Sequence, residues 1–290
     1  MFEIIPVAAA PGGDAYLLVT SGKTALIDSG YAFCASQLIE NIKSHLGDRP
    51  LDYVFLTHTH YDHASGSAYC RHEWPNLQVV GSAYAKKVFS RPSAIRTMRE
   101  MNDAASLRWG TGSYDDKLDD LDVDLVVSDG DIIDMGVFTF TVYEAPGHTR
   151  DSIAYYSPQA DLFISCETLG TIPFGQKVMP CFLVGYQICI DAIERLRPLA
   201  PKYMVLPHYG LISGEWAENY FDDALACHEE TKERILEGYK AGKNKEELMA
   251  ILKDMFYKDR LAAGQPVEAF MLNASYTVPM IIKECLGEEI

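Results

Sequence analysis

The sequence lacks the features that mark several special classes of protein. Its longest apolar runs, such as Tyr53–Leu56 and Ile188–Ile190, fall far short of the roughly 20 residues that a helix needs to cross a bilayer. The N-terminus carries Glu3 and no basic segment, so it does not resemble a signal peptide. The seven cysteines include no CxxC pair, and reduced thiols are a simpler interpretation than a disulfide framework. We therefore expect a cytoplasmic protein without a membrane span.

Basic residues are also scarce. The 290 residues include 25 Lys and Arg against 41 Asp and Glu, which gives a formal charge of −16. A surface that follows a phosphodiester backbone needs the opposite balance, so we expect a small-molecule substrate and no nucleic acid. We interpret one local group of basic residues as a solvated helix face: Lys86, Lys87, Arg91, Arg96 and Arg99.

Hydrophobic residues make up 48% of the chain and charged residues 23%, which is typical of a globular protein. Short β-rich runs alternate with segments of helical periodicity, and the chain becomes almost wholly helical near its end. This order predicts an α/β (αββα) sandwich of two mixed β-sheets flanked by helices. We expect one domain at 1–212 with a helical insertion at 83–118, and a helical extension at 213–290. The expected strands are 2–7, 15–20, 24–28, 52–57, 78–81, 125–127, 132–133, 137–143, 152–156, 162–165 and 203–206, and the expected helices are 34–46, 184–196, 216–238, 245–256 and 267–286.

The most informative segment follows the expected strand at 52–57. Three of the eight histidines fall within six residues there, in the order His58, His60 and His63, together with Asp62. Side chains two residues apart on an extended stretch point the same way, so His58 and His60 can share one metal ion. Asp62 and His63 lie on the turn beyond and can reach a second metal beside the first. The segment therefore predicts a metal site.

These residues also resemble a known family. The segment 58–63 matches the HxHxDH motif of the metallo-β-lactamase fold superfamily of metallo-hydrolases, and the resemblance runs from about residue 4 to about residue 212. It implies that His148, in Ala-Pro-Gly-His-Thr, joins His58 and His60 on the first metal. It implies that His208, in Val-Leu-Pro-His, joins Asp62 and His63 on the second. Asp28 resembles the family's aspartate that supports the ligands without touching metal.

One position departs from the family pattern. The family usually has an aspartate that bridges the two metals, whereas this chain reads Ser-Cys-Glu-Thr at 165–168. Alignment on Thr168 places Glu167 at the bridge, and alignment on Leu162 and Phe163 places Cys166 there. We favour Glu167, because a carboxylate bridges two cations more naturally than a thiolate does. Cys166 would then lie beside the site.

The resemblance implies a hydrolase that acts on a small ester, thioester or lactone-type substrate through a metal-bridging hydroxide. Asp62 would be the catalytic residue that orients the nucleophile, and Tyr209, next to His208, would face the substrate. The cofactors would be two divalent metal ions, with Zn²⁺ expected and Fe or Mn as alternatives. The run at 165–170 also resembles the flavodiiron branch, so an iron oxidoreductase of flavodiiron or sulfur-dioxygenase type is an alternative. A non-catalytic ligand binder on the same fold is another.

The helical extension raises two further expectations. It resembles the tail of thioesterase-like branches, which favours a thioester. An apolar helix face at Met249, Leu252 and Phe256 fits a homodimer and packing within the chain equally well. Several aromatic residues are available to line the metal cleft, although core packing is the commoner role of any one of them: Trp109, Tyr114, Phe174, Tyr186, Tyr209, Phe270 and Tyr276.

Overall fold

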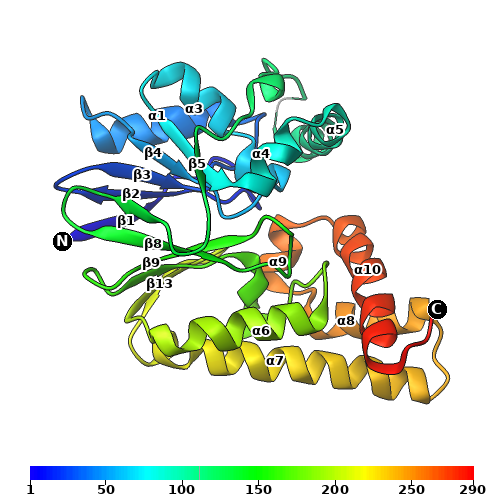
Figure 1. Cartoon of the computed structure of the whole chain (residues 1–290). Coiled ribbons are helices and arrows are strands. Elements are labelled where there is room, and N and C mark those ends of the chain that lie inside the picture. The colour runs from blue at the N-terminus through cyan, green and yellow to red at the C-terminus, as the bar shows by residue number, and fades with distance from the viewer. Residues whose placement is uncertain (111) are drawn as a thin grey trace. The chain divides into compact units, whose positions relative to one another are not determined.

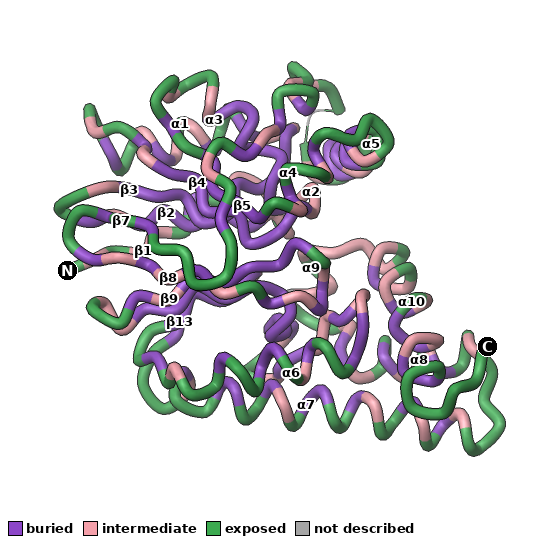
Figure 2. Tube along the Cα trace, in the orientation of Figure 1, coloured by how far each residue is buried: buried purple, intermediate pink, exposed green. Residues whose placement is uncertain are grey.

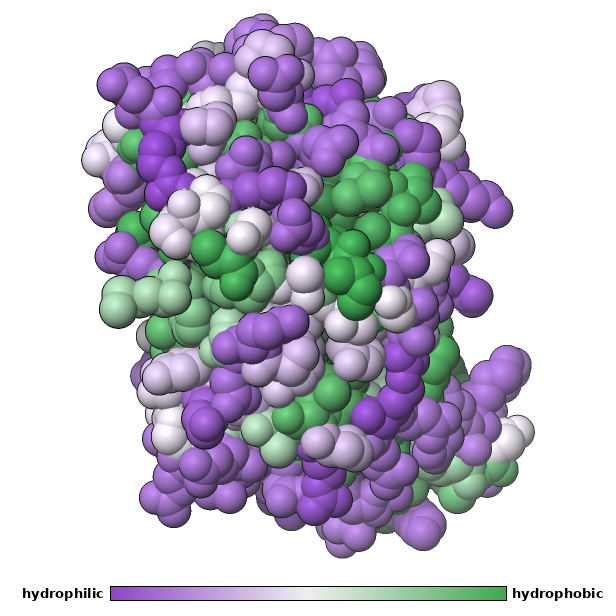
Figure 3. All heavy atoms as spheres, turned by 60° about the vertical axis from the view of Figure 1, so that its left-hand side comes forward, coloured by the Kyte–Doolittle hydropathy of each residue, from purple (hydrophilic) through white to green (hydrophobic). Residues whose placement is uncertain are grey.

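The computed structural model describes residues 1–110 and 112–290; Thr111, which falls in the expected insertion at 83–118, lies outside the described residues. The seven cysteines are present as thiols. Among the described residues, no helix combines the length and the apolar character that crossing a membrane requires. Figure 3 shows one face of the molecule, where hydrophilic residues predominate and hydrophobic residues form smaller patches.

The chain divides into two compact units. The first contains residues 1–144 and 153–165, and the second contains residues 145–152 and 166–290. The expected domain boundary near residue 212 stays a prediction.

The first unit contains two sheets. One has the strand order β1-β2-β3-β4-β5-β6, with β1 to β3 antiparallel and β3 to β6 parallel. The other contains an antiparallel meander in which β8 pairs with β7 and β9, and β9 pairs with β10. The strands are β1 (Phe2–Pro6), β2 (Tyr16–Thr20), β3 (Thr24–Ile27), β4 (Tyr53–Phe55), β5 (Gln78–Ser82), β6 (Leu125–Val127), β7 (Ile132–Asp134), β8 (Thr139–Glu144), β9 (Ile153–Ser157) and β10 (Leu162–Ile164).

Strands β3, β4 and β5 are largely buried on both faces, which explains their apolar sequences (Figure 2). Alternate side chains point to opposite sides. Val54 faces the helices on one side, where it belongs to the same core cluster as Leu38 and Ile42. Phe55 faces the second sheet, with its ring centroid 4.9 Å from that of Tyr155. Helices and the second sheet thus enclose the first sheet (Figure 1).

Helix α1 (Ala35–Leu46) shows how the sequence pattern becomes packing. Leu38, Ile42 and Leu46 recur every four residues and all three are buried against the sheet. The helix ends at Gly47, whose φ of 58° lies in the left-handed region that glycine adopts without strain. The remaining helices of this unit are α2 (Tyr61–Ala64), α3 (Ser67–Glu73), α4 (Ala83–Phe89), α5 (Pro92–Trp109) and the 3₁₀ turn η1 (Leu118–Asp120).

The second unit is mostly helical. Helices α6 and α7 pack against each other, and α7 also packs on the two hairpins β11–β12 and β13–β14 (Figure 1). Helices α8 and α10 pack on each other and on α7. The elements are η2 (Glu167–Leu169), β11 (Thr171–Phe174), β12 (Lys177–Met179), α6 (Tyr186–Leu196), η3 (Arg197–Leu199), β13 (Tyr203–Leu206), β14 (Gly210–Ser213), α7 (Glu215–Lys240), α8 (Lys245–Phe256), α9 (Asp259–Gly264) and α10 (Val267–Leu286).

The apolar face of α8 packs within the unit. Leu252 and Phe256 are buried in a cluster that includes Ile235, Phe270 and other residues of α7 and α10, and Met249 is half-buried against the same cluster. Packing within the chain is therefore confirmed for this face. The homodimer stays a prediction.

Several elements differ from the sequence-based expectations, each for a local reason. Strand β4 ends at Phe55 rather than at 57, because the Thr57 N–H donates to the Asp28 carboxylate instead of joining the sheet. Helix α6 begins two residues later than expected, where the Glu284 carboxylate accepts from the N–H groups of Tyr186 and Gln187. The short hairpin β11–β12, strand β14 and helix α9 were not expected.

Candidate metal centre

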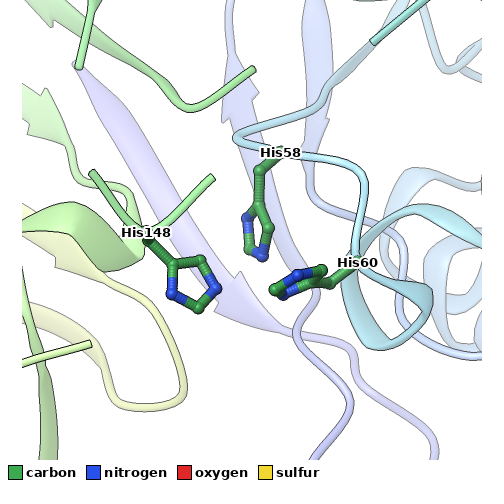
Figure 4. Close-up of side chains that lie close together, drawn as sticks. All are labelled: His58, His60 and His148. Atoms are coloured by element: carbon green, nitrogen blue, oxygen red, sulfur yellow. The ribbon is translucent and has the colours of Figure 1, made fainter. Parts of the chain in front are cut away.

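The first part of the candidate site is the loop and short helix that follow β4. His60 has an extended backbone conformation and directly precedes α2, and its carbonyl oxygen accepts from the N–H groups of His63 and Ala64. This turn begins the helix at Tyr61 and leaves His58 on the extended stretch. His58 is buried, whereas His60 is half-buried. Their ring centroids lie 4.6 Å apart (Figure 4). The expected proximity of these two imidazoles is confirmed.

Asp28 organises this loop from the end of β3. Its Oδ1 accepts from the Thr57 N–H at 2.8 Å, and its Oδ2 accepts from the Thr57 hydroxyl at 2.7 Å. The same Oδ2 lies 2.8 Å from Nδ1 of His63. Asp28 and His63 are both almost fully buried. One carboxylate therefore holds the loop backbone and a histidine ring together.

These contacts assign the tautomers of two rings. A carboxylate can only accept, so Nδ1 of His63 carries the proton that it donates to Asp28. The Thr57 hydroxyl donates to Asp28, so its oxygen accepts from Nδ1 of His58, which lies 3.0 Å away. Both rings then present Nε2 as the lone-pair nitrogen. Holding Nδ1 in this way is the usual means by which proteins orient histidine ligands of metals.

Further carboxylates lie around the same loop. Asp62, whose side chain is 20% exposed, has its Oδ2 3.8 Å from Nε2 of His63. Asp14 is buried and lies 3.8 Å from Nδ1 of the same ring. Ligand atoms of Asp28, His58 and His63 all fall within 4.8 Å of one another. The first unit alone thus gathers imidazole nitrogens and carboxylate oxygens suited to a divalent cation.

Two tyrosines stand beside Asp62. Burial, followed by the negative charge of Asp62, raises the pKa of Tyr31 and of Tyr61 well above that of an ordinary phenol. The two rings lie 5.5 Å apart. Both phenols therefore stay protonated at neutral pH and add no negative charge to this side of the loop.

The second part of the candidate site belongs to the other unit and begins with His148 in the loop 145–152. The His148 N–H donates to the Thr168 hydroxyl at 3.1 Å, and that hydroxyl donates to the Ala145 carbonyl at 2.6 Å. A side chain at Gly147 would collide with its surroundings, since its Cβ would meet Cys189 Sγ at 2.3 Å. The loop therefore requires glycine directly before the histidine.

The ring of His148 is fixed by a backbone carbonyl. Its Nδ1 lies 2.6 Å from the carbonyl oxygen of Cys181, so Nδ1 carries a proton that it donates to that carbonyl. Burial, followed by the charge of Glu167, raises the pKa of the Cys181 thiol and keeps it neutral. Cys181 thus contributes through its backbone and not as a thiolate. Figure 4 draws this ring with those of His58 and His60.

Glu167 occupies the space between two histidines of the second unit. Its Oε2 lies 3.0 Å from Nε2 of His148, and its Oε1 lies 2.7 Å from Nε2 of His208. The Cys166 thiol is buried and instead approaches the Ala145 carbonyl oxygen at 4.0 Å. The carboxylate, rather than the thiol, is therefore in contact with both histidines.

His208 follows β13 in a tight turn. Its φ of 56° is in the left-handed region, which histidine adopts more readily than bulky residues do. Tyr209 comes next, and its half-buried ring packs edge-on against Trp216 at 4.9 Å. The role of Tyr209 toward a substrate stays a prediction.

Comparison with known proteins places this arrangement in a family. The family model described as the metallo-beta-lactamase superfamily matches residues 10–208. The chain belongs to the metallo-β-lactamase superfamily. The expected family and the α/β sandwich fold are therefore confirmed, and the class of enzyme agrees with relatives that are named as hydrolases.

Two relatives are similar to this chain in sequence. A metallo-beta-lactamase fold-containing protein of Sulfurisphaera tokodaii is 25% identical over 62% of this chain and 68% of its own length. A hydroxyacylglutathione hydrolase of Ruegeria pomeroyi is 29% identical over 60% of this chain. The match spans about half, 54%, of the length of that hydrolase.

Solved structures agree on the fold of this superfamily member. A metallo-beta-lactamase family protein from Thermus thermophilus aligns with a TM-score of 0.63 at 17% identity, over 98% of this chain and 93% of its own. The archaeal protein from Sulfolobus tokodaii aligns with a TM-score of 0.59 at 21% identity, over 78% and 84% of the two chains. At these identities the likeness concerns the fold alone.

The sequence identified the histidine motif and Asp28, which accepts from the ring of His63, but it missed other residues around these histidines. Within the first unit these are Thr57, whose hydroxyl contacts Nδ1 of His58, and Asp14, which lies 3.8 Å from Nδ1 of His63. Within the second unit they are Thr168, which accepts from the backbone N–H of His148, and the Cys181 carbonyl, which accepts from its ring. The Thr57 hydroxyl had a local signal, because it precedes the first histidine directly. Cys181 had none, because its carbonyl reaches His148 from 33 residues away.

Proposed function

We propose that this chain is a metal-dependent hydrolase of a small ester, thioester or lactone-type substrate. The observation that carries the proposal is the common setting of three histidines. His58, His63 and His148 each have Nδ1 on a hydrogen-bond acceptor, which turns Nε2 into the ligating nitrogen. The relatives named hydroxyacylglutathione hydrolase support a thioester, since that name denotes hydrolysis of a thioester.

The donor set fits two divalent cations, and we propose zinc. Imidazole nitrogens with carboxylate oxygens are ligands that zinc accepts readily. Glu167 supports a bridging role, because its two oxygens contact His148 and His208, which belong to different proposed metals. The proposed ligands are His58, His60 and His148 for the first ion, Asp62, His63 and His208 for the second, and Glu167 between them.

Two such cations, when bound, would lower the pKa of a shared water and polarise a substrate carbonyl. The residues of the chain supply the rest. Asp62, one fifth exposed, would orient the attacking water and accept its proton at Oδ2. Asp28 and the Cys181 carbonyl hold the rings of His63 and His148 so that little reorganisation accompanies the reaction.

The proposal is tested by element-resolved metal analysis of protein purified without added metal and without chelator, followed by assays on a panel of esters and thioesters. We expect close to two zinc ions per chain and hydrolysis that a chelator abolishes and zinc restores. His148→Gln should lose metal and activity. His72→Gln is the matched control, because His72 is exposed and pairs with Asp120 on the surface.

Other metal contents would contradict specific parts of the proposal. Iron with consumption of oxygen or nitric oxide would favour the oxidoreductase alternative. One metal per chain or none would contradict Glu167 as a bridge. Two zinc ions without hydrolysis of any ester, thioester or lactone would refute the substrate class while leaving the metal ligands intact.

A further inference from the structure

A pocket of about 40 Å³ lies in the second unit beside His148. The segment Met179–Leu183 forms one wall, and residues of α7, α8 and α10 form the others. Figure 1 shows these helices gathered at one end of α7. A volume of this size holds about three non-hydrogen atoms, since a single water needs roughly 10–15 Å³ by the same measure. The pocket therefore suits a short group and not a large ligand.

The walls of the pocket are mostly apolar. Leu252, Phe256 and Phe270 are buried side chains that line it. Of the described residues that line it, none is Lys, Arg, Asp or Glu, and the titratable side chains are those of His148 and Cys181. A charged group would lose its hydration here without gaining an opposite charge. The occupant must therefore be neutral.

One hydrogen-bond acceptor in this wall is unmatched. Gln265 lines the pocket, and its Oε1 is buried with no hydrogen-bond partner among the described residues. The backbone of Gln265 is fixed on both sides, by its N–H to Leu261 at 2.8 Å and by the Tyr257 hydroxyl on its carbonyl at 2.7 Å. A buried amide oxygen that accepts no hydrogen bond lowers the stability of the fold. The unmatched Oε1 of Gln265 therefore points to a ligand that donates a hydrogen bond to it.

The two threonine hydroxyls of the pocket do not donate to Gln265. The hydroxyls of Thr231 and Thr277 already donate to the carbonyls of Cys227 and Phe182. Asn273 adds a second neutral amide to the lining. An apolar pocket with a few neutral polar groups is the usual form of a small-molecule subsite.

The pocket is tied directly to the proposed metal ligand. Cys181 lines the pocket, and its carbonyl accepts from Nδ1 of His148. A group that enters the pocket therefore lies against the ring whose Nε2 is proposed to hold metal. A substrate whose carbonyl reacts there would place the adjoining chain in this pocket.

We propose that this pocket binds the acyl chain of the substrate, a neutral chain of about three non-hydrogen atoms that carries a hydrogen-bond donor for Gln265. The identity of the ligand as a substrate's acyl chain rests on the proposed hydrolase function, whereas binding of such a chain in the pocket does not. The donor is a hydroxyl or an amide N–H. We expect anionic acyl chains to be rejected, because none of the described residues that line the pocket is Lys or Arg.

Binding to the full-length protein tests the proposal without any reaction. The probes are the N-methylamides of 3-hydroxypropanoic, butanoic, malonamic and malonic acids, titrated by ligand-observed NMR. They carry a hydroxyl, a methyl, an amide and a carboxylate, respectively, at the end of the acyl chain. We expect the hydroxyl or the amide probe to bind at least about tenfold tighter than the methyl probe, as the loss of one buried hydrogen bond predicts. The carboxylate probe should not bind measurably.

Gln265→Leu should abolish the preference for a donor while retaining the fold. We expect about a tenfold loss of affinity for the preferred probe, unchanged or tighter binding of the methyl probe, and an unchanged or higher Tm. Gln187→Leu is the matched control, because Gln187 is exposed on α6 and bonds to Asp191. Ala274→Val, which narrows the pocket, should weaken every probe and provides a second variant should Gln265→Leu not fold.

Binding of the methyl probe as tight as that of both donor probes, or binding unaffected by both variants, would overturn the proposal. Thioesters of the same four acids separate its failure from that of the hydrolase function. Hydrolysis of all four at similar rates would support the hydrolase and refute the acyl pocket. Selective binding of the probes without hydrolysis of any thioester would support the pocket and refute the hydrolase.

Discussion

A buried histidine in α7 should lower the free energy of unfolding of the second unit as the pH falls below neutral. His228 is fully buried, its Nδ1 lies 2.7 Å from the Ala224 carbonyl oxygen, and its ring centroid lies 5.6 Å from that of Phe182. Nε2 has no hydrogen-bond partner among the described residues. A second proton would place a charge in apolar surroundings. Burial therefore lowers the pKa of His228 from its ordinary 6.5 to about 4.

The sign and size of the effect follow from these two values. Between pH 6.5 and 4 the unfolded chain takes up a proton that the folded chain refuses, so the free energy of unfolding falls as the pH falls. With a pKa of 6.5 unfolded and about 4 folded, the loss between pH 7.5 and pH 4.5 is roughly 2.5 kcal/mol from this side chain. The stabilisation is fully present above pH 6.5.

Urea unfolding at a series of pH values, with chelator present throughout so that metal release does not contribute, measures this loss. His228→Leu removes the titrating group at similar volume, and subtraction of its pH profile from that of the wild type isolates His228. His45→Leu, on the exposed side of α1, controls for the removal of one histidine. A difference between wild type and His228→Leu that stays flat from pH 7.5 to 4.5 would refute the reasoning.

Three further predictions concern the candidate site and its supports. Asp28→Asn replaces one of the two carboxylate oxygens that accept from Thr57 and His63, and asparagine tolerates the left-handed φ of 51° at this position. Metal affinity, measured by chelator competition, should fall about 10- to 100-fold. An unchanged affinity would contradict the role of Asp28. Gly147→Ala should lower the free energy of unfolding by about 1–3 kcal/mol, because the new Cβ meets Cys189 Sγ at 2.3 Å; a neutral result in urea would mean that the loop shifts without cost. Asn244→Ala removes the capping box of α8 and should cost about 1 kcal/mol in the same assay. Ser275→Ala should not, because this half-buried hydroxyl on α10 donates to the Leu272 carbonyl of its own helix.

The elements that depend on local pattern were predictable from the sequence. The four-residue recurrence of Leu38, Ile42 and Leu46 defines a helix because a single amphipathic face suffices to bury it. The continuous apolar run at 53–56 predicts a buried strand, because a strand that is covered on both faces needs apolar side chains on both. The motif at 58–63 was readable because its residues are adjacent in the chain, and the structure brings His58, His60 and His63 together as expected.

Elements stabilised by distant partners were not predictable. The start of α6 depends on a carboxylate 97 and 98 residues away, at Glu284, and no pattern near Tyr186 reveals it. The hairpin β11–β12 consists of strands of four and three residues joined at Gly175, too short for an alternating pattern to stand out. Such elements exist because of tertiary packing, which overrides weak local preferences.

The choice between Glu167 and Cys166 shows why a site needs both kinds of argument. The sequence offers two alignments that differ by one residue, and the backbone decides between their consequences. Cys166 has an extended conformation and directly precedes η2, whose first residue is Glu167, so adjacent side chains diverge at this point. The thiol turns toward the Ala145 carbonyl, while the carboxylate lies within 3.0 Å of Nε2 of His148 and 2.7 Å of Nε2 of His208. Chemical preference favoured the carboxylate from the outset, and the turn explains why the carboxylate rather than the thiol lies beside both rings; the bridging role itself stays a prediction.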